Sequence, residues 1–213
     1  MSIDIHQLMA WFSPSFPIGA FSYSHGLEQV MADDQYFNAA KLESWIKHVL
    51  LKGSGRNDAI LLVQSYQATD STKRLEIVDL ALALSAGGER HMETLNQGTA
   101  FAKTASAVLE RPFVAGAFPT VVGDVAKDQN IDLEQVVRAY LHAFVANLVS
   151  AAVRFVPLGQ VEGQKVLNAL FPDIDGVAGE ALTSTIADLG SSCLLADLAS
   201  ISHETLEPRI FRT

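Results

Sequence analysis

The sequence has 213 residues, of which 49% are hydrophobic and 18% are charged, and its formal net charge is −9. This apolar content is enough for a packed core and excludes a chain that is disordered by composition. The negative charge argues against nucleic acid as the main partner, because phosphate is repelled.

Compartment and membrane association follow from three simple features. The single cysteine, Cys193, cannot form an internal disulfide, which favours a reducing compartment. The N-terminal residues show no secretory signal. The most apolar long stretch, residues 144–156, is shorter than the roughly 20 residues that cross a bilayer. We therefore expect a soluble cytoplasmic protein with no membrane contact.

Residues 3–12 have apolar side chains at helical spacing and predict a short helix that ends before Pro14. Residues 13–28 then differ in chemistry from the rest of the chain, since they combine prolines and glycines with serines, aromatics and His25. One interpretation is a loop whose aromatics fill the core before Ser22 or Ser24 caps the next helix. A binding role is the other, because ordered loops often carry function.

Periodicity and capping signals predict most of the remaining elements. Asn38, Asp70 or Ser71, Asp132, and Ser191 or Ser192 are the expected N-caps. The pattern predicts one helix that stops at Gly53, a second over residues 58–67 and a third that is closed by Gly87 and Gly88. Further helices are expected over residues 89–109, 133–155, 160–171, 181–189 and about 192–206. Residues 53–55 are expected to form a turn and residues 172–179 a polar connection. Residues 113–126 contain the adjacent pair Val121 and Val122, which could pass for a strand, but no partner strand is apparent.

The helix at residues 89–109 is expected to turn its apolar side chains inward. The inward residues would be Met92, Leu95, Ala102 and Val108. The opposite, polar face would carry Glu89, Arg90, Glu93, Asn96 and Gln97. Together the elements predict an all-α fold: one domain over residues 1–213, a bundle of about ten helices, with a short docking tail at residues 208–213.

A search for catalytic motifs is negative. The sequence has no phosphate-binding P-loop, no nucleophile elbow, and no histidine or cysteine pair at metal-ligand spacing. The residues alone therefore give no case for an enzyme, a resident metal or a cofactor.

Two other segments are unusual. Residues 157–164 place glycines and glutamines at a helix junction, which is typical of a tight turn between helices. Residues 208–213 carry two arginines beside Ile210 and Phe211, although chain ends are usually polar. Such a tail is expected to dock, either onto its own chain or onto a partner, because arginine and aromatic side chains are favoured in interfaces.

These segments together resemble the UreF family of urease accessory proteins. The first matching motif is residues 13–28, and the second is Arg90, Glu93 and Gly98. The late turn at residues 157–164 and the ending from His203 to Arg212 complete the resemblance, which covers nearly the whole chain.

The resemblance implies an all-α, non-enzymatic, chaperone-like factor that works as a homodimer in nickel insertion into apo-urease. Family members bind a second accessory protein, UreD (UreH in some species), and recruit the nickel-carrying GTPase UreG, whose activity the family could modulate. In the family the partner orders the C-terminal tail, which then lies near the N-terminal motif and forms a surface with it. Nucleotide and nickel sites would belong to the partners, so no cofactor is expected here.

Carried over to this sequence, the resemblance gives a set of partner-binding residues. Many relatives have tyrosine where Phe21 stands, and His25 stands where others commonly have glutamine or phenylalanine, so His25 is given no role. We expect Phe21 to face outward, and we expect removal of the tail from Arg209 onward to abolish partner binding while preserving the helical signal. The expected partner-binding residues are Phe21, Tyr23, His203, Glu204, Arg209, Phe211 and Arg212.

One alternative from another class remains. The chain could be an α-helical enzyme that depends on a metal or a small molecule and uses His25, His91 and His203 with neighbouring carboxylates. Tightly bound stoichiometric metal in the purified protein would support it.

Overall fold

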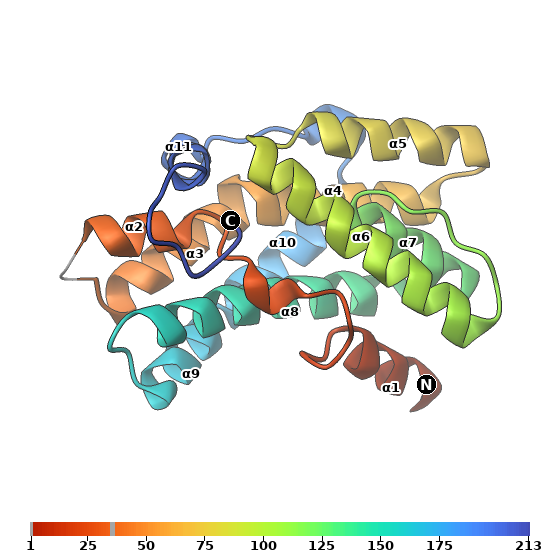
Figure 1. The fold of residues 1–213 in the computed structure, drawn as a ribbon. Helices are drawn as coiled ribbons and strands as arrows, with labels where there is room; N and C mark the ends of the chain where they lie inside the picture. The colour runs from red at the N-terminus through yellow and green to blue at the C-terminus, as the bar shows by residue number, and fades with distance from the viewer. Residues whose placement is uncertain (1, 35–36) are drawn as a thin grey trace.

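The structure is a computed structural model and describes residues 2–34 and 37–213 (Figure 1). Over these residues the chain forms α-helices and two short 3-10 turns, with no β-strand, so the all-α prediction is confirmed. The elements are α1 (Ser2–Trp11), η1 (Ala20–Ser22), α2 (Leu27–Asp33), α3 (Ala39–Lys52), α4 (Ser54–Gln67), α5 (Ser71–Ala83), α6 (Gly88–Leu109), α7 (Phe118–Asp128), α8 (Leu133–Phe155), α9 (Gln160–Ala169), α10 (Phe171–Thr183), η2 (Ile186–Asp188) and α11 (Leu194–His203).

Helix α8 is the central element of the core. It contacts α1, α2, α3, α4, α7, α9 and α10, and its apolar side chains belong to the main hydrophobic cluster. It begins and ends at the predicted residues, and the Asp132 carboxylate accepts a hydrogen bond from the Gln135 amide at 3.0 Å. By length and composition α8 could cross a membrane. Because α8 packs against seven other helices, burial in the core also explains its apolar composition.

Two other predicted caps are confirmed. The Asn38 side chain accepts from the Lys41 amide at the start of α3, and the Asp70 side chain accepts from the Lys73 amide at the start of α5. Each cap satisfies an amide that has no partner within its own helix. At α2 the N-cap is Gly26 rather than Ser22 or Ser24, although the Ser24 hydroxyl accepts from the Glu28 amide at 3.2 Å.

Several predicted boundaries are wrong. Residues 113–126 contain α7, which starts at Phe118 with proline in its first turn, so Val121 and Val122 are helical. The predicted turn at residues 53–55 includes the first residues of α4. Residues 172–179 lie within α10, where Pro172 also occupies the first turn and does not break the helix. The region predicted as a helix over residues 181–189 contains the end of α10 and the short turn η2.

Helices α6 and α7 approach each other closely through a glycine. A Cβ atom at Gly98 would overlap the backbone carbonyl of Gly116, so a side chain at this position would force the two segments apart. This contact fixes the first half of α6 against the core. The same half of α6 carries the polar residues described below.

Candidate functional site

The tail of residues 208–213 docks onto its own chain. From the end of α11 it runs back to η1 and α2 (Figure 1). The Arg212 amide donates to the Ser22 carbonyl at 2.7 Å, and the Ser24 amide donates to the Thr213 carbonyl at 2.8 Å. The tail and the N-terminal motif, far apart in sequence, therefore form one structural unit.

Glu28, in the first turn of α2, anchors the middle of the tail. Its side chain has no exposed surface. Oε1 accepts from the Ile210 amide at 2.7 Å, and Oε2 accepts from the Phe211 amide at 2.8 Å. The helix can start here because Gly26 adopts a φ of +73° and packs against α11, where a Cβ would lie 2.6 Å from the Ser200 nitrogen. One buried carboxylate thus satisfies two tail amides.

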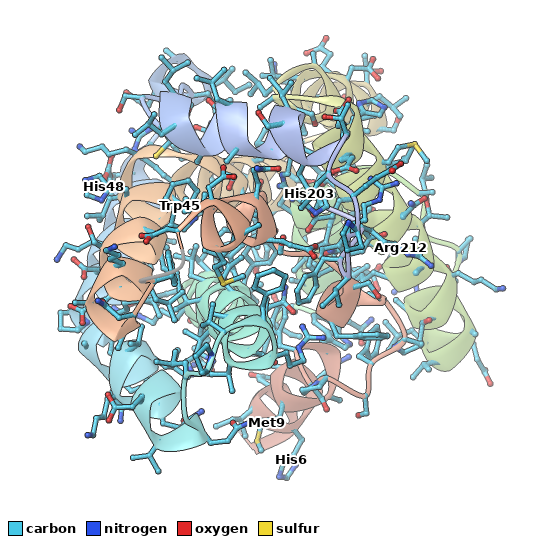
Figure 2. The ribbon with its side chains drawn as sticks, turned by 60° about the vertical axis from the view of Figure 1, so that its left-hand side comes forward. His6, Met9, Trp45, His48, His203 and Arg212 are labelled. Atoms are coloured by element: carbon cyan, nitrogen blue, oxygen red, sulfur yellow. The ribbon has the colours of Figure 1, made fainter. Side chains whose placement is uncertain are left out.

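His203 connects Glu28 to the start of α6. The ring is fully buried; Nε2 lies 2.9 Å from Glu28 Oε2 and Nδ1 lies 2.7 Å from Glu89 Oε2. The other oxygen of Glu89 lies 2.5 Å from Nη1 of Arg209 in the tail. Figure 2 shows His203 inside the molecule, near the tail that carries Arg212. Ionisable groups from α2, α6, α11 and the tail therefore meet in one row.

An aromatic contact holds the tip of the tail. Phe211 is only 3% exposed, and the Arg154 guanidinium lies 4.8 Å from the centre of its ring. Such stacking of a cation on a ring is favourable. Arg154 also donates to the Phe21 carbonyl at 2.8 Å, and burial lowers the pKa of its guanidinium. Arg154 therefore links the tail to the N-terminal motif.

The predicted partner-binding residues divide into two groups. Phe21 is 61% exposed, which confirms that it faces outward. The side chains of Glu204, Arg209 and Arg212 are also exposed, and the Glu204 carboxylate accepts from the Gly88 amide at the start of α6. The remaining three, Tyr23, His203 and Phe211, are buried within the chain in this conformation.

Ala102 is buried and Asn96 exposed, as predicted, but part of the predicted polar face of α6 lies inward. Glu93 and Gln97 are buried, whereas Met92 and Val108, expected inside, are 53% and 71% exposed. Arg90 and Glu93 form an ion pair, and Gln97 donates to Glu93 at 3.0 Å. Inside the protein these polar groups form hydrogen bonds and ion pairs with one another and with groups of the tail. The pattern of apolar residues alone therefore does not identify the buried face of α6.

This inward face of α6 belongs to a buried polar network. Glu93 Oε1 lies 2.9 Å from His25 Nε2, and the Thr213 hydroxyl donates to Glu93 Oε2 at 3.0 Å. The Tyr140 hydroxyl donates to Asp58 at 2.8 Å. The network therefore joins α4, α6 and α8 to the segment before α2 and to the tail.

Charge pairing sets the protonation of this network. Burial acts to raise the pKa of Glu93, but Arg90 and His25 outweigh it and lower the pKa to about 2. Burial raises the pKa of Asp58 despite the nearby Arg90 guanidinium, and burial with the Asp58 charge raises that of Tyr140 well above its usual value. Burial opposes the charge of Arg90, but Glu93 and Asp58 outweigh it and raise the pKa of the guanidinium.

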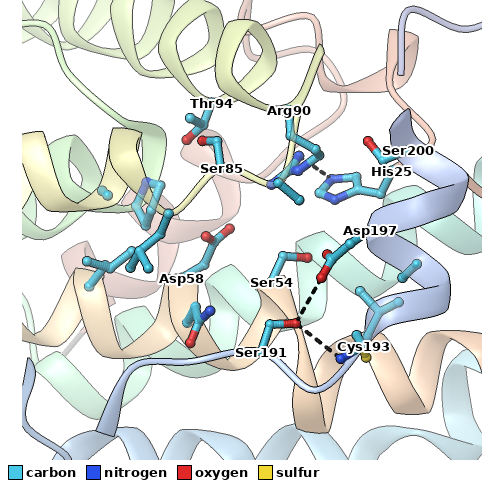
Figure 3. Close-up of a pocket in the computed structure, with 18 residues that line it drawn as sticks. His25, Ser54, Asp58, Ser85, Arg90, Thr94, Ser191, Cys193, Asp197 and Ser200 are labelled. Atoms are coloured by element: carbon cyan, nitrogen blue, oxygen red, sulfur yellow. Dashed lines mark hydrogen bonds between the residues drawn. The ribbon is translucent and has the colours of Figure 1, made fainter. Parts of the chain in front are cut away.

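Two cavities flank the network. One, of about 180 Å³, lies between α4, α11 and the start of α6 and is lined by hydroxyl groups, including Ser54 and Ser200 (Figure 3). The other, of about 290 Å³, is lined by residues of α1, the N-terminal motif and α8, among them the aromatic side chains of Trp11, Phe16 and Tyr140. Four residues line both cavities: His25, Asp58, Arg90 and Thr94. Within the described residues, His25 Nδ1 and Ser200 Oγ are buried without a hydrogen-bond partner.

The three histidines of the alternative prediction do not come together as one site. His203 faces Glu28 and Glu89, His25 faces Glu93, and His91 Nδ1 lies 3.3 Å from the Leu82 carbonyl. Over residues 2–34 and 37–213, no three His, Cys, Asp or Glu side chains are arranged to hold a metal ion.

The outward face of α11 is apolar, which the sequence did not predict. The helix begins after Cys193 and ends at His203, earlier than the expected Leu206. Its inward positions are small or polar, such as Ala199 and Ser200. Large side chains are exposed instead, at fractions between 45% and 75%: Leu194, Leu195, Leu198 and Ile201. A leucine pattern indicates an apolar face but not what covers it.

A groove adjoins this face. It lies between α2, α3 and α11, has a volume of about 450 Å³ and is lined largely by apolar atoms, including those of Trp45 and Leu195. We refer to the four exposed side chains of α11, from Leu194 to Ile201, as the α11 face. Contiguous exposed apolar surface of this kind is typical of protein interaction sites.

Comparison with known proteins gives a consistent result. A family model described as UreF matches residues 37–171. The chain is similar over its whole length to proteins named urease accessory protein UreF: it is 45% identical to the one from Cereibacter sphaeroides over 213 residues, with all of both chains covered. It is 45% identical to that of Roseobacter denitrificans, with 96% of that chain covered, and 41% identical to that of Rhodopseudomonas palustris, with 94% covered.

Proposed function

The chain belongs to the UreF family of urease accessory proteins, and from this membership we propose that it is a soluble cytoplasmic scaffold, not an enzyme, for nickel insertion into apo-urease. As a homodimer it binds a UreD/UreH-type accessory protein and recruits a UreG-type GTPase, whose hydrolysis it could modulate. Nickel and nucleotide are bound by the partners.

The observation that supports this proposal best is the α11 face. Four large apolar side chains exposed on one ten-residue helix cost solvation free energy unless another surface covers them. A UreD-type partner that covers the α11 face would also contact the groove beside it, which places Trp45 and Leu195 in the interface.

A second exposed surface suits the GTPase. Phe21, Ile210, Arg209 and Arg212 are exposed around the tail and the N-terminal motif. Phe21 supplies apolar area, and the planar guanidinium of Arg209 offers several donors to carboxylates or carbonyls of a partner. The three buried members of the predicted set, Tyr23, His203 and Phe211, would support this surface from within.

Substitution of Arg209 tests the recruitment step. We expect Arg209→Ala to reduce capture of the GTPase by the complex with the UreD-type protein roughly tenfold, because interface arginines often contribute about 1–2 kcal/mol. Capture is measured by pull-down. The matched control is Arg111→Ala, since Arg111 is also exposed and ion-paired, to Asp128. Capture at the wild-type level by a folded Arg209→Ala complex would contradict this role.

A further inference from the structure

The larger of the two cavities beside the buried polar network has the construction of a small-molecule site. Helix α1 and the turn η1 both contact α8 (Figure 1), and residues of all three line the cavity together with residues of α6. No residue of α11 or of the tail lines it, so its walls are formed without them. Its volume of about 290 Å³ exceeds the roughly 150 Å³ that hold a benzene molecule in a protein core.

Aromatic side chains form much of the wall and support one another. The ring of Tyr140 lies 6.1 Å from that of Phe12 and 5.4 Å from that of Phe118, measured between ring centres. His25 packs edge-on against Phe144, with the ring centres 4.9 Å apart. Such contacts fix the orientation of each ring, so the cavity is formed before a ligand arrives and less ordering is needed on binding.

The polar end of the cavity offers hydrogen-bond acceptors. His25 Nε2 lies 2.9 Å from a Glu93 oxygen, which only accepts, so Nε2 carries the hydrogen and Nδ1 is left as an acceptor. Nδ1 is buried and has no partner among the described residues. One oxygen of Asp58 accepts from the Tyr140 hydroxyl at 2.8 Å, and this carboxyl group has room for a further donor.

The donors at the same end are already engaged. The Gln97 amide nitrogen donates to Glu93 at 3.0 Å, and that of Asn147 donates at 3.0 Å to a backbone carbonyl of the N-terminal motif. Arg90 lies 3.2 Å from His25 Nε2, but its ion-pair partner is the Glu93 carboxylate. A ligand that fits must therefore bring a donor of its own, whereas an anion would face carboxylates.

We propose that this cavity binds a small aromatic molecule that carries a neutral hydrogen-bond donor, such as the hydroxyl group of a phenol. The ring packs among the aromatic walls, and the donor bonds to the Asp58 carboxyl group or to His25 Nδ1. The ligand thereby satisfies a polar end that the chain leaves rich in acceptors. The inference does not depend on the proposed function.

Three probes with the same ring test the requirement for a donor. At pH 7 phenol is neutral and donates, toluene neither donates nor accepts, and benzoate only accepts. Their affinities for the full chain are measured by titration with saturation-transfer NMR. We expect phenol to bind roughly fivefold more tightly than toluene, because its hydrogen bond outweighs the larger apolar surface of toluene. Benzoate should not bind.

A cavity-filling substitution tests the location. Ala143, on α8, lines the cavity and is only partly buried, so Ala143→Leu fills space that the ligand needs. We expect the affinity for phenol to fall roughly tenfold or more, because protein interiors leave no room for both groups. The control is Ala169→Leu, at an exposed position of α9, which should bind phenol like the wild type.

The proposal is overturned if toluene binds at least as tightly as phenol, since the cavity would then be merely apolar, or if benzoate binds as tightly as phenol. It is also overturned if folded Ala143→Leu keeps the wild-type affinity for phenol. If that variant does not fold, the wild type carries the test: nuclear Overhauser effects between phenol and the ring of Trp11 support the site, and their absence at saturation overturns it.

Discussion

Glu93 is a carboxylate with 1% of its surface exposed, and its side-chain partners come from separate parts of the chain. Arg90 lies one turn before it on α6, but His25 and the hydroxyl of Thr213 come from the N-terminal motif and the tail. Polar residues at helical spacing normally predict a solvent face. The sequence could not reveal that this face is buried, because two of the groups that satisfy it are distant along the chain.

Replacement of Glu93 tests the buried network. We expect Glu93→Gln to destabilise the protein at pH 7 by about 3 kcal/mol, because Arg90 loses its closest counter-charge in a buried site. The folded-state pKa of about 2 lies below the ordinary 4.5, so the contribution of Glu93 is present above pH 4.5 and is lost as pH falls toward 2. Denaturant unfolding at pH 7 and pH 3 should show the gap between wild type and variant shrinking at acid pH.

The control for this experiment is Glu76→Gln, since Glu76 is exposed on α5 and paired with the exposed Lys73. Surface pairs of this kind contribute little. A gap between wild type and Glu93→Gln that stays constant from pH 7 to pH 3 would show that the charge of Glu93 is not what stabilises the fold.

At the scale of elements, a helix is predicted correctly where neighbouring residues set both its cap and its apolar pattern. The bounds of α8 were predicted from Asp132 and a regular apolar pattern, because both the cap and the pattern are local. Helix α10 was missed since Pro172, Gly176 and Gly179 suggested a connection, yet proline fits the first turn of a helix and both glycines lie in open space. Helix α11 was predicted, but which of its faces is buried depends on contacts with α2 and α6.

The tail is the element whose role changes most. The sequence left open whether it docks on its own chain or on a partner, and its deletion was expected to leave the fold unaffected. In the structure it contributes two amides bound to Glu28 and a buried Phe211, on which Arg154 of α8 stacks. Part of the predicted partner-binding set therefore also stabilises the isolated chain.

Deletion of the tail from Arg209 onward should accordingly lower stability. We expect a loss of roughly 2–4 kcal/mol from the buried ring and the charged hydrogen bonds. For a chain of this size that corresponds to a melting temperature lower by about 5–15 °C. Thermal unfolding followed by circular dichroism measures it, with the helical signal at 20 °C unchanged because the tail itself is not helical. An unchanged melting temperature would show that the tail is not docked in solution.

At the scale of the whole molecule, the core and the interaction surfaces differ in how they arise from the sequence. The all-α architecture follows from periodicity and caps, and the motifs at residues 13–28 and from His203 to Arg212 indicate the UreF family from sequence alone. The fold then brings these two motifs together and leaves the α11 face uncovered. A single sequence does not show which apolar face lacks a partner, because that depends on how all the helices are packed.

The central claim is that the chain acts as a scaffold through the α11 face and the tail. Co-expression with a UreD-type protein and a UreG-type GTPase, followed by size-exclusion chromatography with light scattering, tests it most directly. We predict that the wild type elutes in one complex with both, and that Leu195→Glu combined with Leu198→Glu loses the UreD-type protein. Leu75→Glu, at a leucine of α5 that is 54% exposed, should retain it. A folded double variant that assembles like the wild type, or a wild type that elutes alone, would contradict the claim.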